Sequence, residues 1–227
     1  MSLLLVAATL SITADPIATF ESTQEAAVAA AEESQTGTLI FSRGDCLAVK
    51  MFSGGPFTHV AAVVVEDGLA TVYDSMNGVG VRKQGLEEYL DSQNPDVIHV
   101  AHPCVPFTGA ESRAFIEHLE QELGRPYAVA HHLTGGRVEG IHCSEYVTDA
   151  LMSCNLIHAN EPSRVSPASL AEGLFRDELY EPARTFAIVA APLEDDEPRN
   201  WCDKLWIDTK HCTVNCCVKM RRLFFCR

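Results

Sequence analysis

The sequence THVAAVVVEDGLATVYDSM, residues 58–76, decides the fold. Its first half is a nearly continuous apolar run, which is typical of a β-strand with both faces buried. The Asp67-Gly68 pair that follows is a strong signal for a tight hairpin turn. The second half, LATVYDSM, contains the β-branched and aromatic residues that strands favour. We therefore predict an antiparallel hairpin in the middle of a sheet.

Helices and further strands are predicted on both sides of this hairpin. A helix that begins near Thr108 or Ser112 has apolar residues at helical spacing, and Gly124 is well placed to end it. Pro167 suits the first turn of a later helix. The chain is expected to be α+β, with an antiparallel meander flanked by helices. Predicted helices cover 16–35, 85–92, 108–123, 143–154 and 166–175, and predicted strands cover 38–52, 78–83, 96–103 and 185–192.

Composition restricts the classes of function. The chain has 227 residues, of which 47% are hydrophobic, enough for one sizeable core. Its formal net charge of −14 disfavours binding to nucleic acid, whose phosphates are also negative. No run of about 20 apolar residues occurs, so no transmembrane helix is expected. We predict an N-terminal apolar segment and helix (1–36), a core domain (37–192), and an acidic linker with a basic, cysteine-rich tail (193–227).

The sequence is compatible with more than one role for each end of the chain. Residues 3–12 are apolar, but no basic residue precedes them as in most secretory signals, so a buried strand or helix turn is the preferred interpretation. Residues 201–227 carry a net charge of +4, with two tryptophans and five cysteines. Peripheral contact with an anionic membrane, a zinc site, and a disordered or disulfide-tied extension are the alternatives for this tail. We favour an intracellular protein, with secretion or membrane association as alternatives.

Cys143 is the strongest candidate for a nucleophile. It stands in GIHCSE, residues 140–145, where a loop ends and a helix is predicted to begin. Free backbone N–H groups at a helix N-terminus lower the pKa of a thiol and stabilise an oxyanion. The alternative is a buried, inert cysteine, which is the usual fate of cysteines in cores.

A thiolate nucleophile needs a base, and His59 is the best candidate because it opens the apolar strand. Asp74 lies on the return strand of the predicted hairpin, which brings it back toward His59, where it would orient the imidazole. The plainer alternatives are a histidine satisfied by local hydrogen bonds and an aspartate at the end of a strand.

Several stretches of the chain occur together in a characteristic order. They are Gly44-Asp45, FTHVAAVV (57–64), YDSMNGVGVRK (73–83), GLEEYL (85–90), GRPYAVAHH (124–132), HCSEYVTDAL (142–151) and SPASL (166–170). In these stretches, residues 37–192 resemble the circularly permuted papain-fold hydrolases related to the NlpC amidases, of the YiiX/YebB-like branch. The resemblance implies an NlpC-type fold, in which a central antiparallel sheet or half-barrel holds a catalytic cysteine at a helix N-terminus.

The resemblance also implies roles for individual residues. Cys143 would be the nucleophile, His59 the general base and Asp74 the third, polar member of a triad. Tyr127 matches the Pro-Tyr position of the group and would line the substrate cleft, with core packing as its alternative. The neighbours of the cysteine, His142 and Ser144, are expected to contact substrate. The resemblance implies no cofactor and no metal ion.

The expected reaction is attack of the thiolate on a carbonyl group, which gives a thioester that water or another acceptor releases. Amide cleavage in peptides or peptidoglycan-like substrates is favoured, because C-S-E resembles the amidase-like branch more than the lipid acyltransferase branch. The alternatives are acyl transfer or phospholipase action on a lipid acyl chain, a catalytically inactive binding module, and an interaction protein stabilised by zinc.

Overall fold

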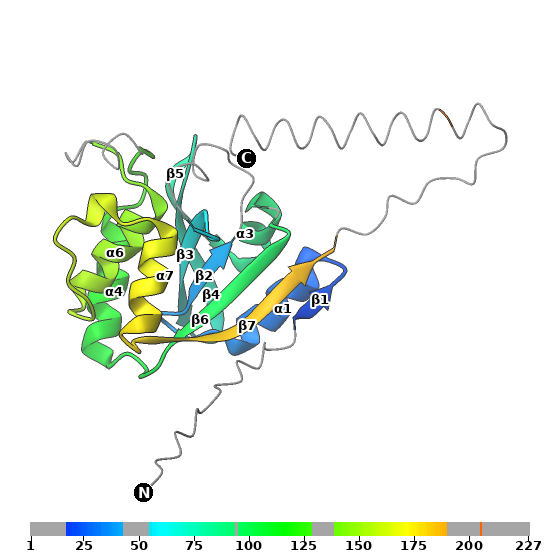
Figure 1. The fold of residues 1–227 in the computed structure, drawn as a ribbon, viewed down its shortest axis with the longest axis horizontal. Helices are drawn as coiled ribbons and strands as arrows, with labels where there is room; N and C mark the ends of the chain where they lie inside the picture. The colour runs from blue at the N-terminus through cyan, green and yellow to red at the C-terminus, as the bar shows by residue number, and fades with distance from the viewer. Residues whose placement is uncertain (1–16, 43–54, 94, 129–138, 190–204, 206–227) are drawn as a thin grey trace, which may run out of the picture.

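A computed structural model of the chain describes residues 17–42, 55–93, 95–128, 139–189 and 205 (Figure 1). These residues form an α+β fold, which confirms the α+β class that the sequence predicts. The strands are β1 (Ala18–Phe20), β2 (Leu39–Ser42), β3 (His59–Glu66), β4 (Leu69–Met76), β5 (Gly80–Gly85), β6 (Val97–Pro103) and β7 (Tyr180–Ile188). The α-helices are α1 (Thr23–Glu33), α3 (Leu86–Gln93), α4 (Gly109–Gln121), α6 (Cys143–Ser153) and α7 (Pro167–Arg176), and a 3-10 helix covers Pro162–Arg164.

The seven strands found among the described residues form one mixed sheet, in the order β1-β7-β6-β2-β3-β4-β5. Neighbouring strands are antiparallel except β1 and β7, which run parallel. The central hairpin is confirmed: Asp67 and Gly68 adopt φ angles of 50° and 79°, and Glu66 pairs with Leu69 across the turn. Strands β2 to β5 therefore form the antiparallel meander that the sequence predicts.

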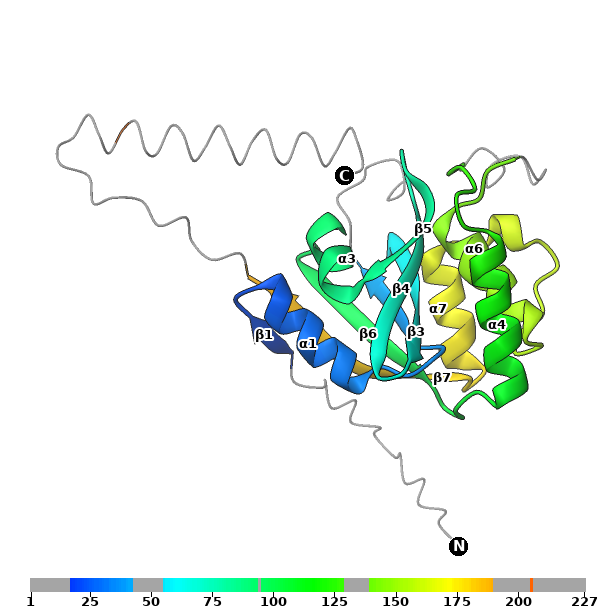
Figure 2. The same cartoon turned by 180° about the vertical axis from the view of Figure 1, so that it is seen from behind.

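Helices cover both faces of the sheet and divide the core in two. Helices α4, α6 and α7 lie on one face, and Figure 2 shows α1 and α3 on the other. Alternation along β2 sends Leu39 and Phe41 into the core under α6 and α7, and Ile40 into the core under α1 and α3. Because both faces of the central strands are buried, their sequences are continuous apolar runs.

The N-terminal region differs from the prediction. Residues 18–20 form an edge strand rather than the start of a helix, and α1 begins after Ser22, whose hydroxyl accepts a hydrogen bond from the Glu25 N–H. Strand β1 pairs with β7, which is remote in sequence. Local helix propensity therefore does not predict this strand. Three alanines of α1 are buried in the core. The folded unit therefore extends beyond the predicted boundary between residues 36 and 37.

Strand β7 begins at Tyr180, five residues before the predicted start. The sequence does not predict this part of the strand because it contains Pro182, and proline cannot donate a hydrogen bond to a sheet. The structure places this proline next to an irregularity, where the register of β6 and β7 shifts between Val100 and Ala101. Such bulges are among the few positions in a sheet that tolerate proline.

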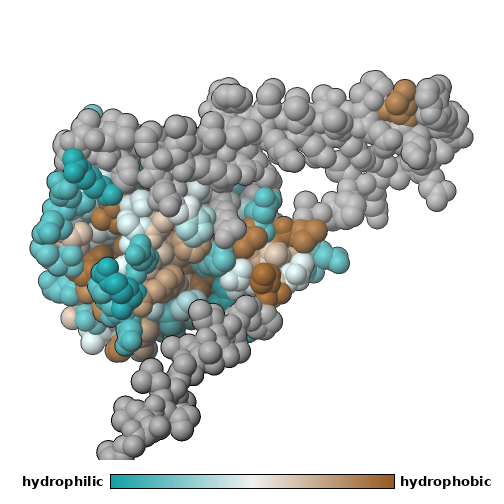
Figure 3. All heavy atoms as spheres, in the orientation of Figure 1, coloured by the Kyte–Doolittle hydropathy of each residue, from teal (hydrophilic) through white to brown (hydrophobic). Residues whose placement is uncertain are grey.

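Apolar side chains reach the surface near β1 and β7, on the face drawn in Figure 3. Ile17, just before β1, and Val189, just after β7, are 62% and 53% exposed. Within the described residues, no helix has the length and apolar character needed to cross a membrane. The predicted N-terminal apolar segment, the continuation of the predicted strand at 43–52, and the basic tail, apart from Leu205, lie outside the described residues.

Candidate active site

Cys143 is the first residue of α6, as the sequence predicts. His142 is the N-cap: its backbone is extended, and its Nδ1 accepts a hydrogen bond from the Glu145 N–H at 3.2 Å. The chain entering the helix is held by Ser75, whose Oγ donates to the Ile141 carbonyl at 2.7 Å. The thiol is only 4% exposed and lies at the end of the helix where free N–H groups gather.

His59 is the first residue of β3, and Asp74 lies near the end of β4. The register pairs Ala62 with Tyr73, which places Asp74 diagonally across from His59 on the same face of the sheet. The distance between His59 Nε2 and Asp74 Oδ2 is 3.1 Å. The structure therefore brings together the two residues that the hairpin prediction placed on neighbouring strands.

The Asp74 carboxylate is fully buried and is held by several side chains. Arg82 Nε donates to Oδ1 at 2.8 Å, and Gln93 Nε2 donates to Oδ2 at 3.1 Å. Arg82 Nη2 also donates to Ser92 Oγ at 3.0 Å, which ties the guanidinium to α3. Burial acts to raise the pKa of Asp74, but hydrogen bonds and charge from His59 and Arg82 outweigh it, so the pKa is lowered. The carboxylate is therefore ionised and fixed beside the imidazole.

Sequence analysis misses Arg82 and Gln93, although the sequence does carry a signal for the first. Asn77-Gly78 is a hairpin signal, and the observed register places Arg82 directly opposite Asp74. Opposite charges facing each other across antiparallel strands stabilise the pair. Gln93 reaches the carboxylate from the end of α3, a contact for which no local pattern exists.

The Cys143 thiol and the His59 imidazole lie close enough for each group to shift the pKa of the other. Burial opposes charge on both groups, but their mutual attraction outweighs it: the pKa of Cys143 falls to about 6 and the pKa of His59 rises to about 10. Both shifts act in the same direction, because each favours the thiolate and imidazolium forms of the pair over the neutral forms. Asp74 engages Nε2 of His59, which leaves Nδ1 for the thiol.

Tyr89 of α3 packs against the imidazole and is a further residue that sequence analysis misses. Its fully buried ring stacks on His59, with the ring centroids 6.3 Å apart and the planes 27° apart. Burial raises the pKa of Tyr89, and the charges of Asp74 and Cys143 raise it further. The phenol therefore stays neutral while its ring restrains the orientation of the imidazole.

His142 and Ser144 are buried and hydrogen-bonded within the protein, and their contacts with substrate stay a prediction. His142 Nε2 lies 2.8 Å from the Ser163 carbonyl, which places a proton on Nε2 and leaves Nδ1 as an acceptor. Ser144 Oγ donates to the Val165 carbonyl at 2.7 Å. Burial acts to lower the pKa of His142, but contact with Cys143 outweighs it and raises the pKa, so this imidazole also favours the thiolate.

Tyr127 lies on a segment that is pressed against β5 and the start of α6. Two glycines permit this approach, because a Cβ at Gly80 or at Gly140 would lie 2.4 or 2.7 Å from a carbonyl oxygen of the segment. Tyr127 is half-buried, and its pKa is raised by burial and by the nearby charge of Cys143. The tyrosine is thus close to the thiol, and lining of the substrate cleft stays a prediction for it.

The cysteines among the described residues are Cys104, Cys143 and Cys154, and all three are free thiols. No group of three or more His, Cys, Asp or Glu side chains in the described part of the chain is arranged to hold a metal ion. The tail cysteines, which the zinc alternative requires, lie outside the described residues.

Comparison with known proteins adds one resemblance of overall shape. The sequence matches no protein-family model and no curated protein sequence. Among solved structures, the fold is similar to that of the metalloprotein YiiX from Escherichia coli O157:H7, DUF1105, with a TM-score of 0.47 and 15% sequence identity. The alignment covers 69% of this chain and 89% of that chain. At this level of similarity we transfer no residue role and no activity.

Proposed function

We propose that the chain is a cysteine hydrolase with a permuted papain-like, NlpC-type fold. Cys143 is the nucleophile, His59 is the general base, and Asp74 orients His59. The proposal is carried by the position of the Cys143 thiol at the start of a helix, close to an imidazole that contacts a buried carboxylate. This arrangement favours the thiolate at neutral pH and directs backbone N–H groups at an oxyanion.

The reaction proceeds in two halves. The Cys143 thiolate attacks the carbonyl carbon of an amide, a C–S bond forms, and the C=O electron pair moves onto oxygen, where helix N–H groups stabilise it. The tetrahedral intermediate collapses to a thioester, and the departing amine takes the proton from the His59 imidazolium. His59 then removes a proton from water, which attacks the thioester and releases the acid and the thiolate.

Amides of the peptide or peptidoglycan type are the substrates we propose first, because the C-S-E helix start resembles the amidase-like branch. Acyl transfer from a lipid is the second candidate. A mostly apolar pocket between residues 55–57 and helix α7 favours it. A catalytically inactive binding module would keep the same fold without turnover, and the experiment below separates this case from both enzymes.

The experiment measures turnover and the covalent intermediate with the same substrates. Peptide p-nitroanilides, peptidoglycan fragments, p-nitrophenyl esters and phospholipid vesicles are incubated with the wild type, Cys143→Ala and the matched control Cys154→Ala. We expect an acyl adduct on Cys143 by intact-protein mass spectrometry. Turnover should fall at least about 10³-fold in Cys143→Ala, and Cys154→Ala should retain both turnover and adduct. Cys154 is equally buried at the other end of the same helix.

Two outcomes would contradict the proposal. Turnover by Cys143→Ala at the wild-type rate would remove Cys143 from the mechanism. Absence of turnover and of an adduct with every substrate, together with saturable binding of one of them, would identify a binding module instead.

A further inference from the structure

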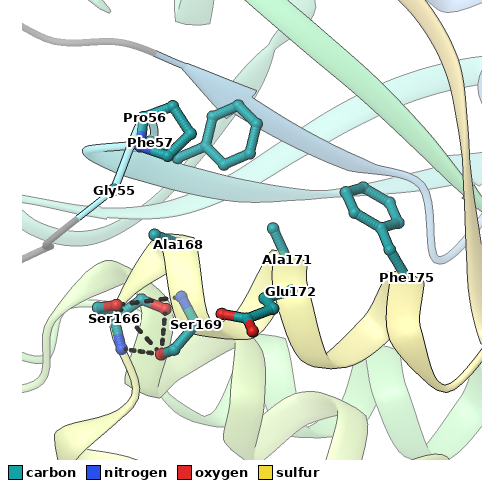
Figure 4. A pocket seen from close by; sticks show the side chains of 9 residues that line it. All are labelled: Gly55, Pro56, Phe57, Ser166, Ala168, Ser169, Ala171, Glu172 and Phe175. Carbon is teal, nitrogen blue, oxygen red and sulfur yellow. Dashed lines mark hydrogen bonds between the residues drawn. The ribbon is translucent and has the colours of Figure 1, made fainter. Parts of the chain in front are cut away.

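A pocket of about 400 Å³ lies between residues 55–57 and helix α7 (Figure 4). Pockets that bind small organic groups have volumes of roughly 300–1,000 Å³, and this one lies within that range. It is formed by described residues alone, and none of them takes part in the catalytic contacts. The catalytic contacts therefore do not explain what this pocket does.

The side chains that face this pocket are mostly apolar. In Figure 4, Ala168, Ala171 and Phe175 point from α7 toward the ring of Phe57. The serine hydroxyls at the start of α7 form a capping box with each other, so hydrogen bonds within the protein already engage them. Burial of a polar group against such walls is costly without a partner, whereas burial of hydrocarbon is favourable.

Both walls of the pocket continue into the active site. On one side, Phe57 precedes the base His59 by two residues. On the other side, α7 begins just after Val165, whose carbonyl accepts the hydrogen bond from Ser144, the residue next to Cys143. Both walls of the pocket are therefore connected to residues of the candidate site, through Phe57 on one side and through Val165 on the other.

We infer that this pocket binds an apolar group of the substrate on which Cys143 acts. The inference rests on the proposed function and deepens it, because it names hydrocarbon as the chemistry that the site recognises next to the reacting carbonyl. A lipid acyl chain and an apolar amino-acid side chain both supply this chemistry. The exposed carboxylate of Glu172, which also lines the pocket, disfavours substrates that carry a negative charge at this position.

Alkylation of Cys143 by N-alkyl iodoacetamides tests the pocket without requiring turnover. In the wild type, the rate constant should rise about two- to fourfold for each added methylene from methyl to hexyl, as each group enters the pocket. Ala168→Phe fills the pocket and should lower the hexyl-to-methyl ratio of rate constants at least tenfold. Ala110→Phe, on the exposed start of α4, is the matched control and should keep the wild-type ratio.

A wild-type ratio near one, or an unchanged ratio in Ala168→Phe, would overturn the inference. If a circular-dichroism melt shows that Ala168→Phe has lost its fold, Ala168→Leu tests the same ratio with a smaller group. Turnover of p-nitrophenyl esters from acetate to octanoate, and of peptide p-nitroanilides with glycine or leucine, shows which source supplies the hydrocarbon. Chain-length-dependent alkylation without turnover of any substrate would support the pocket and contradict the proposed function.

Discussion

The two ends of helix α6 carry the same side chain in opposite electrostatic environments. Cys143 begins the helix and Cys154 is the C-cap, and each is 4% exposed. Burial acts to raise the pKa of both thiols, yet the pKa of Cys143 falls to about 6 whereas that of Cys154 is raised. Burial alone therefore does not decide which of the two thiols ionises more readily.

The neighbours of each thiol explain the difference. At the N-terminus, free N–H groups and the imidazoles of His59 and His142 favour negative charge on Cys143. At the C-terminus, the Cys154 thiol donates to the Leu151 carbonyl at 3.2 Å, a bond that only the protonated form makes. Cys154 therefore serves as an internal reference thiol. The effect of each substitution is measured as the alkylation rate of Cys143 relative to that of Cys154.

His59→Gln should change the alkylation rate of Cys143, relative to that of Cys154, more than any other substitution proposed. Glutamine keeps hydrogen-bonding groups but cannot hold the cation that stabilises the thiolate, so the pKa of Cys143 returns toward that of an ordinary thiol. Alkylation of Cys143 at pH 7 should then fall at least about 30-fold, because the thiolate fraction drops from nearly one to a few per cent. Site-resolved mass spectrometry after iodoacetamide treatment measures both thiols in one sample. A Cys143 rate within twofold of the wild type would show that His59 is not its partner.

Asp74→Asn should have an intermediate effect. The amide keeps the shape of the carboxylate but removes the charge that holds the imidazolium, so alkylation of Cys143 at pH 7 should fall about 3- to 10-fold. Arg82 loses its buried partner, which should lower the free energy of unfolding by about 2–3 kcal/mol in urea titrations. Asp177→Asn, which changes an exposed carboxylate, is the control and should shift stability by less than about 0.5 kcal/mol. Equal effects of the two substitutions would contradict the assigned role of Asp74.

His142→Asn should have the smallest effect on the alkylation of Cys143. Asparagine is a good N-cap but loses the bond from Nε2 to the Ser163 carbonyl, so the free energy of unfolding should fall by about 1–3 kcal/mol. His142→Ala also loses the cap and should cost about 1 kcal/mol more. Because His59 remains, alkylation of Cys143 should fall only a few-fold in both variants. If His142→Asn lowered the alkylation rate of Cys143 as much as His59→Gln does, the roles assigned to the two histidines would be wrong.

The sequence predicts the features of the site that depend on residues close together in the chain. The hairpin of β3 and β4 follows from one apolar run and the Asp67-Gly68 turn, and it places His59 and Asp74 on neighbouring strands. The start of α6 follows from the change of pattern at Cys143. These features depend on residues close together in the chain, where hydrophobic periodicity and turn chemistry are informative.

The contacts between remote segments are not readable in the same way. Tyr89 and Gln93 lie on a helix that the sequence predicts, but its pattern does not show that it packs against the base. Strand β1 is short and joins β7 across most of the chain, and Pro182 conceals the start of β7. The burial of Ser144 follows from its bond to Val165, which depends on the path of a loop. Packing between remote segments decides all of these positions, and one-dimensional patterns do not contain it.

The most direct test of the account is the pH dependence of alkylation of Cys143 and Cys154 in the wild type. A thiol with a lowered pKa is ionised above that value and loses its reactivity as the pH falls through it. The account therefore predicts that the alkylation rate of Cys143 rises with a midpoint near pH 6, while that of Cys154 rises only above the range of an ordinary thiol. Midpoints for the two thiols that coincide above pH 8 would contradict it.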